Sequence, residues 1–184
     1  MKSICVYCGA SPGNSPLYAE AARQLARAMV EKQIDLVYGG GNVGLMGIIA
    51  DEVLRLGGKV TGVIPHGLVE RELAHRSLTE LHIVKDMHER KAKMASLAEG
   101  FIALPGGMGT LEELFEMLTW SQLGFHQKPI GLINVNHFYD GLLSFLQHAS
   151  AAGFIKPAHL QLLHHEDEAD GLINIFCTLG TTEL

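Results

Sequence analysis

The sequence predicts a Rossmann-like α/β fold, in which a doubly wound parallel sheet is enclosed by helices in three αβα layers. Two observations carry this prediction. Short apolar runs alternate with longer segments of helical period, and each apolar run leads into a glycine-rich or polar turn. Such alternation is typical of βαβ units, whose helices cover both faces of a parallel sheet. The 184 residues, 47% of them hydrophobic, suit one core, so we expect a single domain over residues 1–184.

The predicted strands are the short apolar runs. In chain order they are Ser3–Tyr7, Asp35–Tyr38, Lys59–Ile64, His82–Val84, Phe101–Leu104 and Ile130–Val135. In an open parallel sheet, ligands bind beyond the carboxyl ends of the strands, where the strand order reverses. The turns that follow these runs are therefore where we expect the chemistry.

The predicted helices have apolar residues at helical spacing. The segment Ser15–Lys32 carries them at Leu17, Ala21, Leu25, Ala28 and Met29. The other helices are expected at Val43–Leu56, His88–Ala98, Thr110–Leu123 and Tyr139–Ala151. After Gly153 a weaker pattern predicts two more helical segments, Ala158–Leu163 and Ala169–Thr178.

Charge and apolar patterning exclude several classes of partner. The net charge is -6, the lysines and arginines are scattered, and no basic patch is evident, so neither nucleic acid nor an acidic membrane surface is expected as a partner. No apolar stretch approaches the ~20 residues that span a bilayer, and the apolar run in MKSICVYCGA is too short for a signal peptide.

The cysteines indicate a reducing compartment. Cys5, Cys8 and Cys177 form an odd set rather than a disulfide framework, so we expect a cytoplasmic protein. Cys5 and Cys8 have the spacing of zinc ligands, but no second pair follows. Residues three apart on a strand also point to opposite faces. We therefore predict packing roles for both thiols and no metal site.

A first glycine cluster, GGGNVGLMG, follows the second predicted strand. Gly39, Gly41 and Gly44 match G-x-G-x-x-G, a pattern that lets backbone N–H groups approach phosphate or ribose. Two features disfavour a dinucleotide: the cluster does not follow the first strand, and no acidic residue ends the next strand, KVTGVIP. The glycines could instead serve helix–sheet packing alone. The substrate-binding candidates in this turn are Gly40, Gly41 and Gly44.

A second glycine cluster lies in FIALPGGMGTLEELFEML, between a buried strand and a helix expected to begin near Thr110. Glycines before a helix N-terminus leave free N–H donors at the positive end of the helix dipole, which suits a phosphate. The candidates for phosphate binding are Gly106, Gly107, Met108, Gly109 and Thr110. Neither glycine cluster continues into the G-K-[ST] of a Walker motif.

Glu113 follows Thr110 by three residues, and this spacing allows two interpretations. One is a capping box, in which the threonine caps the helix and the glutamate reaches back to the cap. The other follows from electrostatics, because an acid beside a bound phosphate would repel it and therefore needs a further task.

A basic stretch, MHERKAKM, opens the predicted helix His88–Ala98. Its three cations lie in the first turns, where the helix dipole disfavours positive charge, so an anionic partner is one interpretation. The other is a solvated face on which Glu89 offsets part of the charge. The three cations are Arg90, Lys91 and Lys93.

In these three stretches the sequence closely resembles the LONELY GUY family, the cytokinin riboside 5′-monophosphate phosphoribohydrolases, often described as possible lysine decarboxylases. The hallmark P-G-G-x-G-T-x-x-E is matched from Pro105 to Glu113, and M-H-x-R-K from Met87 to Lys91. The resemblance extends through CVYCGAS, LTWSQLG and KPIGLINV to about Gly153. Ala10 stands where relatives often have serine, which leaves one hydroxyl contact in doubt.

The resemblance implies a Rossmann-like homodimer with its active site near the subunit interface. It implies Glu113 and Arg90 as the catalytic pair, with Glu72 as a further substrate contact. Lys91 is our own further candidate for substrate binding. No lysine has a recognisable pyridoxal-phosphate context, so no cofactor is expected. The predicted reaction is hydrolysis of the N-glycosidic bond of a nucleoside 5′-monophosphate, AMP included, to free base and ribose 5-phosphate. The alternative is a non-catalytic carrier of a nucleotide or molybdopterin on the same fold.

Overall fold

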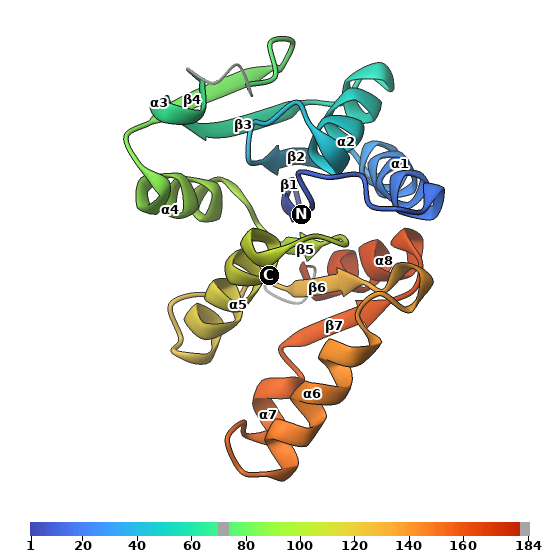
Figure 1. Ribbon diagram of the computed structural model, residues 1–184, viewed down its shortest axis with the longest axis vertical. Helices are drawn as coiled ribbons and strands as arrows, with labels where there is room; N and C mark the ends of the chain where they lie inside the picture. Colours follow the sequence, from blue (N-terminus) through green and yellow to red (C-terminus); the bar gives the residue numbers. More distant parts are fainter. Residues whose placement is uncertain (70–73, 181–184) are drawn as a thin grey trace.

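The computed structural model describes residues 1–69 and 74–180, and a seven-stranded sheet runs through its centre (Figure 1). The strand order is β4-β3-β2-β1-β5-β6-β7, and every pair of neighbouring strands is parallel. The strands are β1 Ser3–Tyr7, β2 Asp35–Tyr38, β3 Val60–Pro65, β4 Glu80–Val84, β5 Phe101–Ala103, β6 Ile130–Ile133 and β7 Leu163–Glu166.

Helices cover both faces of this sheet, which confirms the predicted fold class. On one face lie α1 Pro16–Glu31, α2 Gly44–Arg55 and α8 Ala169–Gly180, and on the other α4 Met87–Leu97, α5 Met108–Gln122 and α6 Asp140–Ala151. Three short helical segments, α3 His66–Val69, η1 Val135–His137 and α7 Pro157–Leu160, complete the described elements. Among the residues in these ranges, no helix is long and apolar enough to cross a bilayer.

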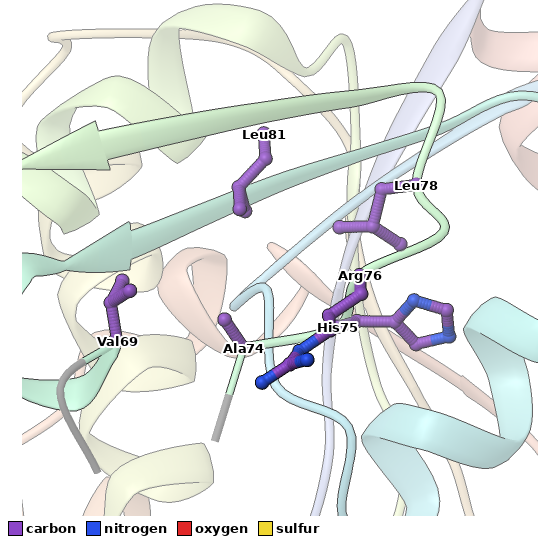
Figure 2. Close-up of a pocket in the computed structure, with 6 residues that line it drawn as sticks. All are labelled: Val69, Ala74, His75, Arg76, Leu78 and Leu81. Atoms are coloured by element: carbon purple, nitrogen blue, oxygen red, sulfur yellow. The ribbon is translucent and has the colours of Figure 1, made fainter. Parts of the chain in front are cut away.

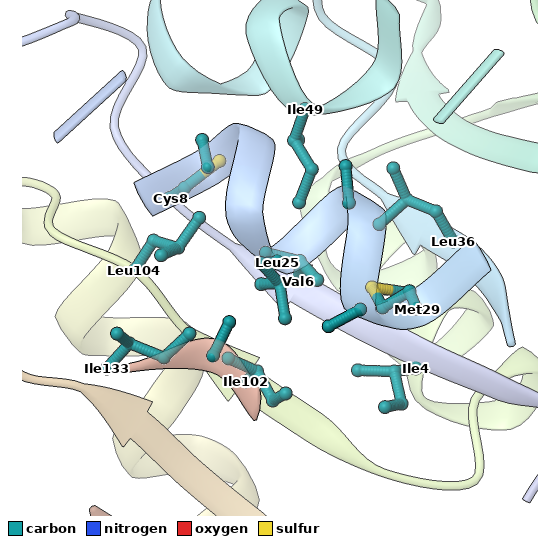
Figure 3. Packing of buried hydrophobic residues seen from close by; sticks show 14 of the residues in the cluster. Ile4, Val6, Cys8, Leu25, Met29, Leu36, Ile49, Ile102, Leu104 and Ile133 are labelled. Atoms are coloured by element: carbon teal, nitrogen blue, oxygen red, sulfur yellow. The ribbon is translucent and has the colours of Figure 1, made fainter. Parts of the chain in front are cut away.

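Alternation along β1 divides the core between the two faces of the sheet. Ile4 and Val6 join the cluster with Leu25 and Met29 of α1 (Figure 3), whereas Cys5 and Tyr7 join the cluster under α4 and α5. Cys8, three residues after Cys5, packs in the α1 cluster. The two thiols are therefore buried on opposite faces, as their spacing predicts.

The tail corrects one prediction. The segment 158–163 is not one helix, because α7 ends at Leu160 and Leu163 begins the edge strand β7. The strand sequence LHHE has a single buried side chain, so it lacks the apolar run by which the other strands are recognised. What makes it a strand is pairing with β6, including the Asn134 N–H donated to the Glu166 carbonyl at 2.8 Å. Because this pairing joins residues far apart in the sequence, it produces no periodic pattern in the residues of β7 itself.

The strand order reverses between β1 and β5. From β1 the chain builds outward through β2, β3 and β4, then returns to the other side of β1 and continues through β5, β6 and β7. Connections on opposite faces leave a crevice at the carboxyl ends of β1 and β5. Both glycine clusters follow strands that neighbour β1, which places them at this edge.

Candidate functional site

Three loops meet at the carboxyl edge of the sheet. The N–H of Gly9, just beyond β1, donates to the Pro105 carbonyl at 3.0 Å, and the Gly9 carbonyl accepts from the Leu45 N–H at 2.9 Å. The loop after β1 is thus bonded to both glycine clusters. A Cβ at Gly44, whose φ is +57°, would overlap the backbone of Ala10. Glycine at position 44 therefore lets the backbone of the first glycine cluster approach the backbone of the loop after β1.

The second glycine cluster forms an open helix N-terminus. Gly107 is the N-cap, with no side-chain cap, so α5 begins at Met108, two residues earlier than predicted. Met108 is 86% exposed, and a Cβ at Gly107 or Gly109 would meet no atom within 4 Å. The first N–H groups of a helix have no intrahelical acceptor. This end of α5 is therefore accessible to an anion.

Thr110 is buried in the first turn of α5 rather than placed at its cap. A Cβ at Gly106 would overlap the Thr110 hydroxyl oxygen and lie 2.9 Å from Gly9 N, so this glycine lets the loop, the helix and β1 close together. The capping-box interpretation is wrong, because the cap is Gly107 and the Glu113 carboxylate is used elsewhere.

The guanidinium of Arg90 is fixed to β3 and to the residue that follows β2. Its Nε donates to the Val63 carbonyl at 3.1 Å and its Nη2 to the Gly39 carbonyl at 3.1 Å. Its Nη1 lies 3.4 Å from Glu113 Oε1. The helix that carries it, α4, is capped by Asp86, whose carboxylate accepts the Glu89 N–H. The planar fork of arginine thus joins β2, β3 and α5 at one point.

Gly39 makes room for that guanidinium. A Cβ at position 39 would overlap Arg90 Nη2. Gly39 belongs to the G-x-G-x-x-G match, but it is not one of the substrate-binding candidates that the sequence offers in this turn. The sequence pattern marks the position, whereas only the fold shows that its task is to admit an arginine from 51 residues further along the chain.

Burial raises the pKa of Glu113 to about 7, against the lowering influence of the adjacent Arg90. The side chains of Glu113 and Arg90 are only 12% and 11% exposed, so this carboxyl has lost most of its water. Glu112 and Glu116 also raise the pKa of Glu113, and Lys91 lowers it. Glu113 can therefore exchange a proton near neutral pH, as a general acid or base requires.

Lys91 is predicted as a substrate contact, and its ammonium lies against two carboxylates of α5. It pairs with Glu112 and, at 3.1 Å, with Glu116. Two cations of the basic stretch, Arg90 and Lys91, therefore have anionic partners within the chain.

The substrate-binding candidates of the first glycine cluster make contacts other than to Arg90. The Gly40 carbonyl accepts the His75 N–H at 2.9 Å, and the Gly41 carbonyl accepts the Tyr38 hydroxyl at 3.1 Å. Gly44 begins α2. Glu72 lies outside the described residues.

Two cavities flank this edge. One, of about 490 Å³, is bounded by the loop after β1, by Pro105–Gly107, and by Leu45, Tyr18 and Phe138. The rings of Tyr18 and Phe138 meet edge to face at 5.8 Å, and no local signal in the sequence pointed to them. The second cavity, of about 240 Å³, lies beside strands β3 and β4, next to the segment that leads into β4 (Figure 2). It is lined by Val69, Ala74, His75, Arg76, Leu78 and Leu81.

Neither cavity is lined by Arg90 or Glu113. The larger cavity is built from α1, α2 and the segments after β1, β5 and β6, whereas the arginine and the glutamate come from α4 and α5. We place the candidate chemistry at the Arg90–Glu113 pair, because polar groups with a perturbed pKa are what a reaction needs. Among the described residues, no group of three histidine, cysteine, aspartate or glutamate side chains could hold a metal ion.

Comparison with known proteins adds independent findings. Residues 46–176 match the model of a family described as "Possible lysine decarboxylase". The chain is 51% identical to a cytokinin riboside 5′-monophosphate phosphoribohydrolase of Arabidopsis thaliana, over 94% of this chain and 79% of that protein. It is 54% identical to one from Rhodococcoides fascians, over 85% of this chain and 80% of that protein.

Solved structures share the fold at much lower identity. A molybdenum cofactor carrier protein from Chlamydomonas reinhardtii is 18% identical, with a TM-score of 0.75 and 98% of each chain covered. A molybdenum cofactor binding protein from Rippkaea orientalis is 20% identical, with a TM-score of 0.72, covering 97% of this chain and 98% of that one. At such identities the likeness concerns the fold alone. The family match and the half-identical relatives, by contrast, establish that this chain belongs to the "possible lysine decarboxylase" family, the LONELY GUY family that its motifs resemble.

Proposed function

We propose that the chain is a phosphoribohydrolase, which cleaves the N-glycosidic bond of cytokinin riboside 5′-monophosphates. Relatives about half identical over most of the chain carry this name. The observation that carries the proposal is the Arg90–Glu113 pair: a largely buried carboxyl with a pKa of about 7 lies 3.4 Å from a fixed guanidinium, one turn inside an open helix N-terminus.

The 5′-phosphate binds at the start of α5 in this proposal. The free N–H groups of the first turn and the positive end of the helix dipole attract a dianion. The bare Cα atoms of Gly107 and Gly109 let its oxygens approach the backbone. An anchored phosphate fixes the ribose, so its binding energy serves to orient the reacting carbon.

Glu113 acts on the ribose in the same proposal. Breaking the bond builds positive charge on the anomeric carbon and negative charge on the departing base. The ionised Glu113 stabilises that cation and takes a proton from the attacking water, while Arg90 anchors the nucleotide and supports the developing negative charge. Water adds its oxygen to the anomeric carbon, and the base leaves with the bonding electrons and gains a proton. The products are the free base and ribose 5-phosphate.

We further propose that AMP is a substrate, because the features invoked act on phosphate and ribose rather than on the base. A panel of AMP, the isopentenyladenine nucleotide and the zeatin nucleotide tests both levels of the proposal, with released base and ribose 5-phosphate quantified by chromatography. Release from all three supports it. Release of base from the cytokinin nucleotides alone would show that AMP is not a substrate. Release from none of the three would refute the proposed hydrolase activity.

The carrier alternative predicts a different result in the same assay. A carrier binds a nucleotide or molybdopterin and returns it intact, so a thermal shift with AMP would appear without free adenine. The homodimer, the cytoplasmic location and the absence of nucleic-acid and membrane partners stay predictions from the sequence. Light scattering after size-exclusion chromatography would test the first of them.

A further inference from the structure

The imidazole of His75 ties the segment before β4 to helix α2. The residue is only 5% exposed, and its ring points toward α2 (Figure 2), where Nε2 lies 2.9 Å from Asp51 Oδ1. Its Nδ1 accepts the Ser77 N–H at 3.2 Å. A ring nitrogen that accepts a hydrogen bond carries no proton, so the proton lies on Nε2 and is donated to Asp51. Contacts within the chain therefore occupy both ring nitrogens.

The main chain of the same residue holds the first glycine cluster. The His75 N–H donates to the Gly40 carbonyl at 2.9 Å, and the preceding residue, Ala74, pairs with Gly41 in an isolated antiparallel bridge. A substitution at position 75 would leave the N–H in place. What the side chain adds is the anchorage to α2, which keeps this N–H and the residues around it against the glycines.

Gly40 connects this anchorage with Arg90. The Gly39 carbonyl accepts Arg90 Nη2 at 3.1 Å, and the next carbonyl along the chain, that of Gly40, accepts the His75 N–H. Gly40 has a φ of +72°, and glycine has more backbone freedom than any other residue. The direction of the Gly39 carbonyl therefore depends on contacts that hold the turn. Without the contact to His75, rotation at Gly40 would turn that acceptor away from the guanidinium.

We propose that His75 is a positioning residue, which acts through Gly40 and Gly39 to hold Arg90 beside Glu113. This inference rests on the proposed function and deepens it. His75 lies outside both glycine clusters and outside the MHERKAKM stretch, and no motif in the sequence marks it. In this role its imidazole transfers no proton and touches neither the nucleotide nor the reacting atoms.

A double-mutant cycle with Gly39→Ala separates this role from a purely structural one. On its own, His75→Ala should lower kcat/KM for AMP by about tenfold, because a displaced catalytic group costs turnover. In the Gly39→Ala background the guanidinium is already displaced, so adding His75→Ala should lower kcat/KM by less than about twofold. A purely structural His75 predicts the same fractional loss in both backgrounds, and that result would overturn the proposal.

Two further variants allow for the packing that His75→Ala removes from a buried position. His75→Gln keeps an N–H donor for Asp51 and should restore kcat/KM to within about threefold of the wild type. Asp51→Ala removes a side chain that is 69% exposed, so it should lower kcat/KM while the melting temperature changes by only a few degrees. Wild-type kcat/KM in Asp51→Ala would contradict the anchorage. The control is His165→Ala, at an exposed position of the edge strand β7, which should leave kcat/KM unchanged.

Nitrogen-15 NMR of the Arg90 guanidinium measures the same effect without turnover. Its Nε–H, which donates to the Val63 carbonyl, should exchange with water faster in His75→Ala and Asp51→Ala than in the wild type or in His165→Ala. Arg90→Lys assigns the signal by removing it. If the wild type hydrolyses no nucleotide, the proposed function fails, whereas the NMR comparison still decides the role of His75. An Arg90 Nε–H signal with unchanged exchange in His75→Ala overturns that role.

Discussion

The guanidinium of Arg90 occupies the space that a side chain at position 39 would need. Arg90 Nη2 donates to the Gly39 carbonyl at 3.1 Å, and a Cβ on Gly39 would overlap that nitrogen. Two residues from different motifs therefore depend on each other: the glycine after β2 admits the arginine, and the arginine caps the strand end. The contact also orients the guanidinium toward Glu113.

Gly39→Ala should consequently damage the site more than the fold. The overlap is with the far end of a flexible side chain, so Arg90 can swing away at little cost in stability, but it then loses the carbonyls of Gly39 and Val63 and its place beside Glu113. We expect kcat/KM to fall about 100-fold or more while the melting temperature changes by only a few degrees. Gly141→Ala in α6, where a Cβ meets no atom within 4 Å, is the control. Normal activity in Gly39→Ala would contradict the interpretation.

How far the sequence predicts this site depends on the range of each interaction. The two glycine clusters, Glu113 and Arg90 are local motifs, and their positions after parallel strands suffice to bring them to one edge of the sheet. The task of Gly39 is not predictable in this way, because its partner lies 51 residues away. Nor is β7, whose pairing with β6 replaces the apolar pattern it lacks. The sequence therefore predicts features that depend on neighbouring residues, but not those that depend on contacts between distant residues.

Glu113→Gln should keep the nucleotide site and lose the reaction. Glutamine has nearly the same shape and can still accept a hydrogen bond from Arg90, but it cannot take a proton or stabilise a cation by charge. We expect kcat to fall by about 10²- to 10⁴-fold with KM little changed. In the wild type, kcat/KM should rise with pH through a limb near pH 7, because Glu113 must be ionised. A Gln variant that retains near-normal turnover would remove Glu113 from the mechanism.

The raised pKa of Glu113 also predicts how stability depends on pH. A carboxyl whose pKa is about 7 in the folded chain and 4.5 in the unfolded chain favours folding when protonated. That contribution is complete below pH 4.5 and is lost as pH rises through 7. Glu113→Gln has no such loss, so its stability relative to the wild type should increase between about pH 5 and pH 8, by up to about 3 kcal/mol. Urea unfolding at both pH values measures the difference, and a constant difference would show that the pKa is not raised.

Gly107→Ala tests the phosphate site without disturbing the protein around it. The Cβ meets no protein atom within 4 Å, and the backbone of Gly107, at φ -93°, is open to alanine. The added methyl group projects at the cap of α5, where the proposal places the 5′-phosphate. We therefore expect KM for AMP to rise about tenfold or more, with a smaller effect on any residual cleavage of adenosine, which has no phosphate to displace. The stability loss should stay near 1 kcal/mol, the cost of replacing a glycine cap by alanine. If AMP and adenosine respond alike, the methyl group has acted on the ribose or the helix rather than on phosphate, and the anion site must lie elsewhere on this edge.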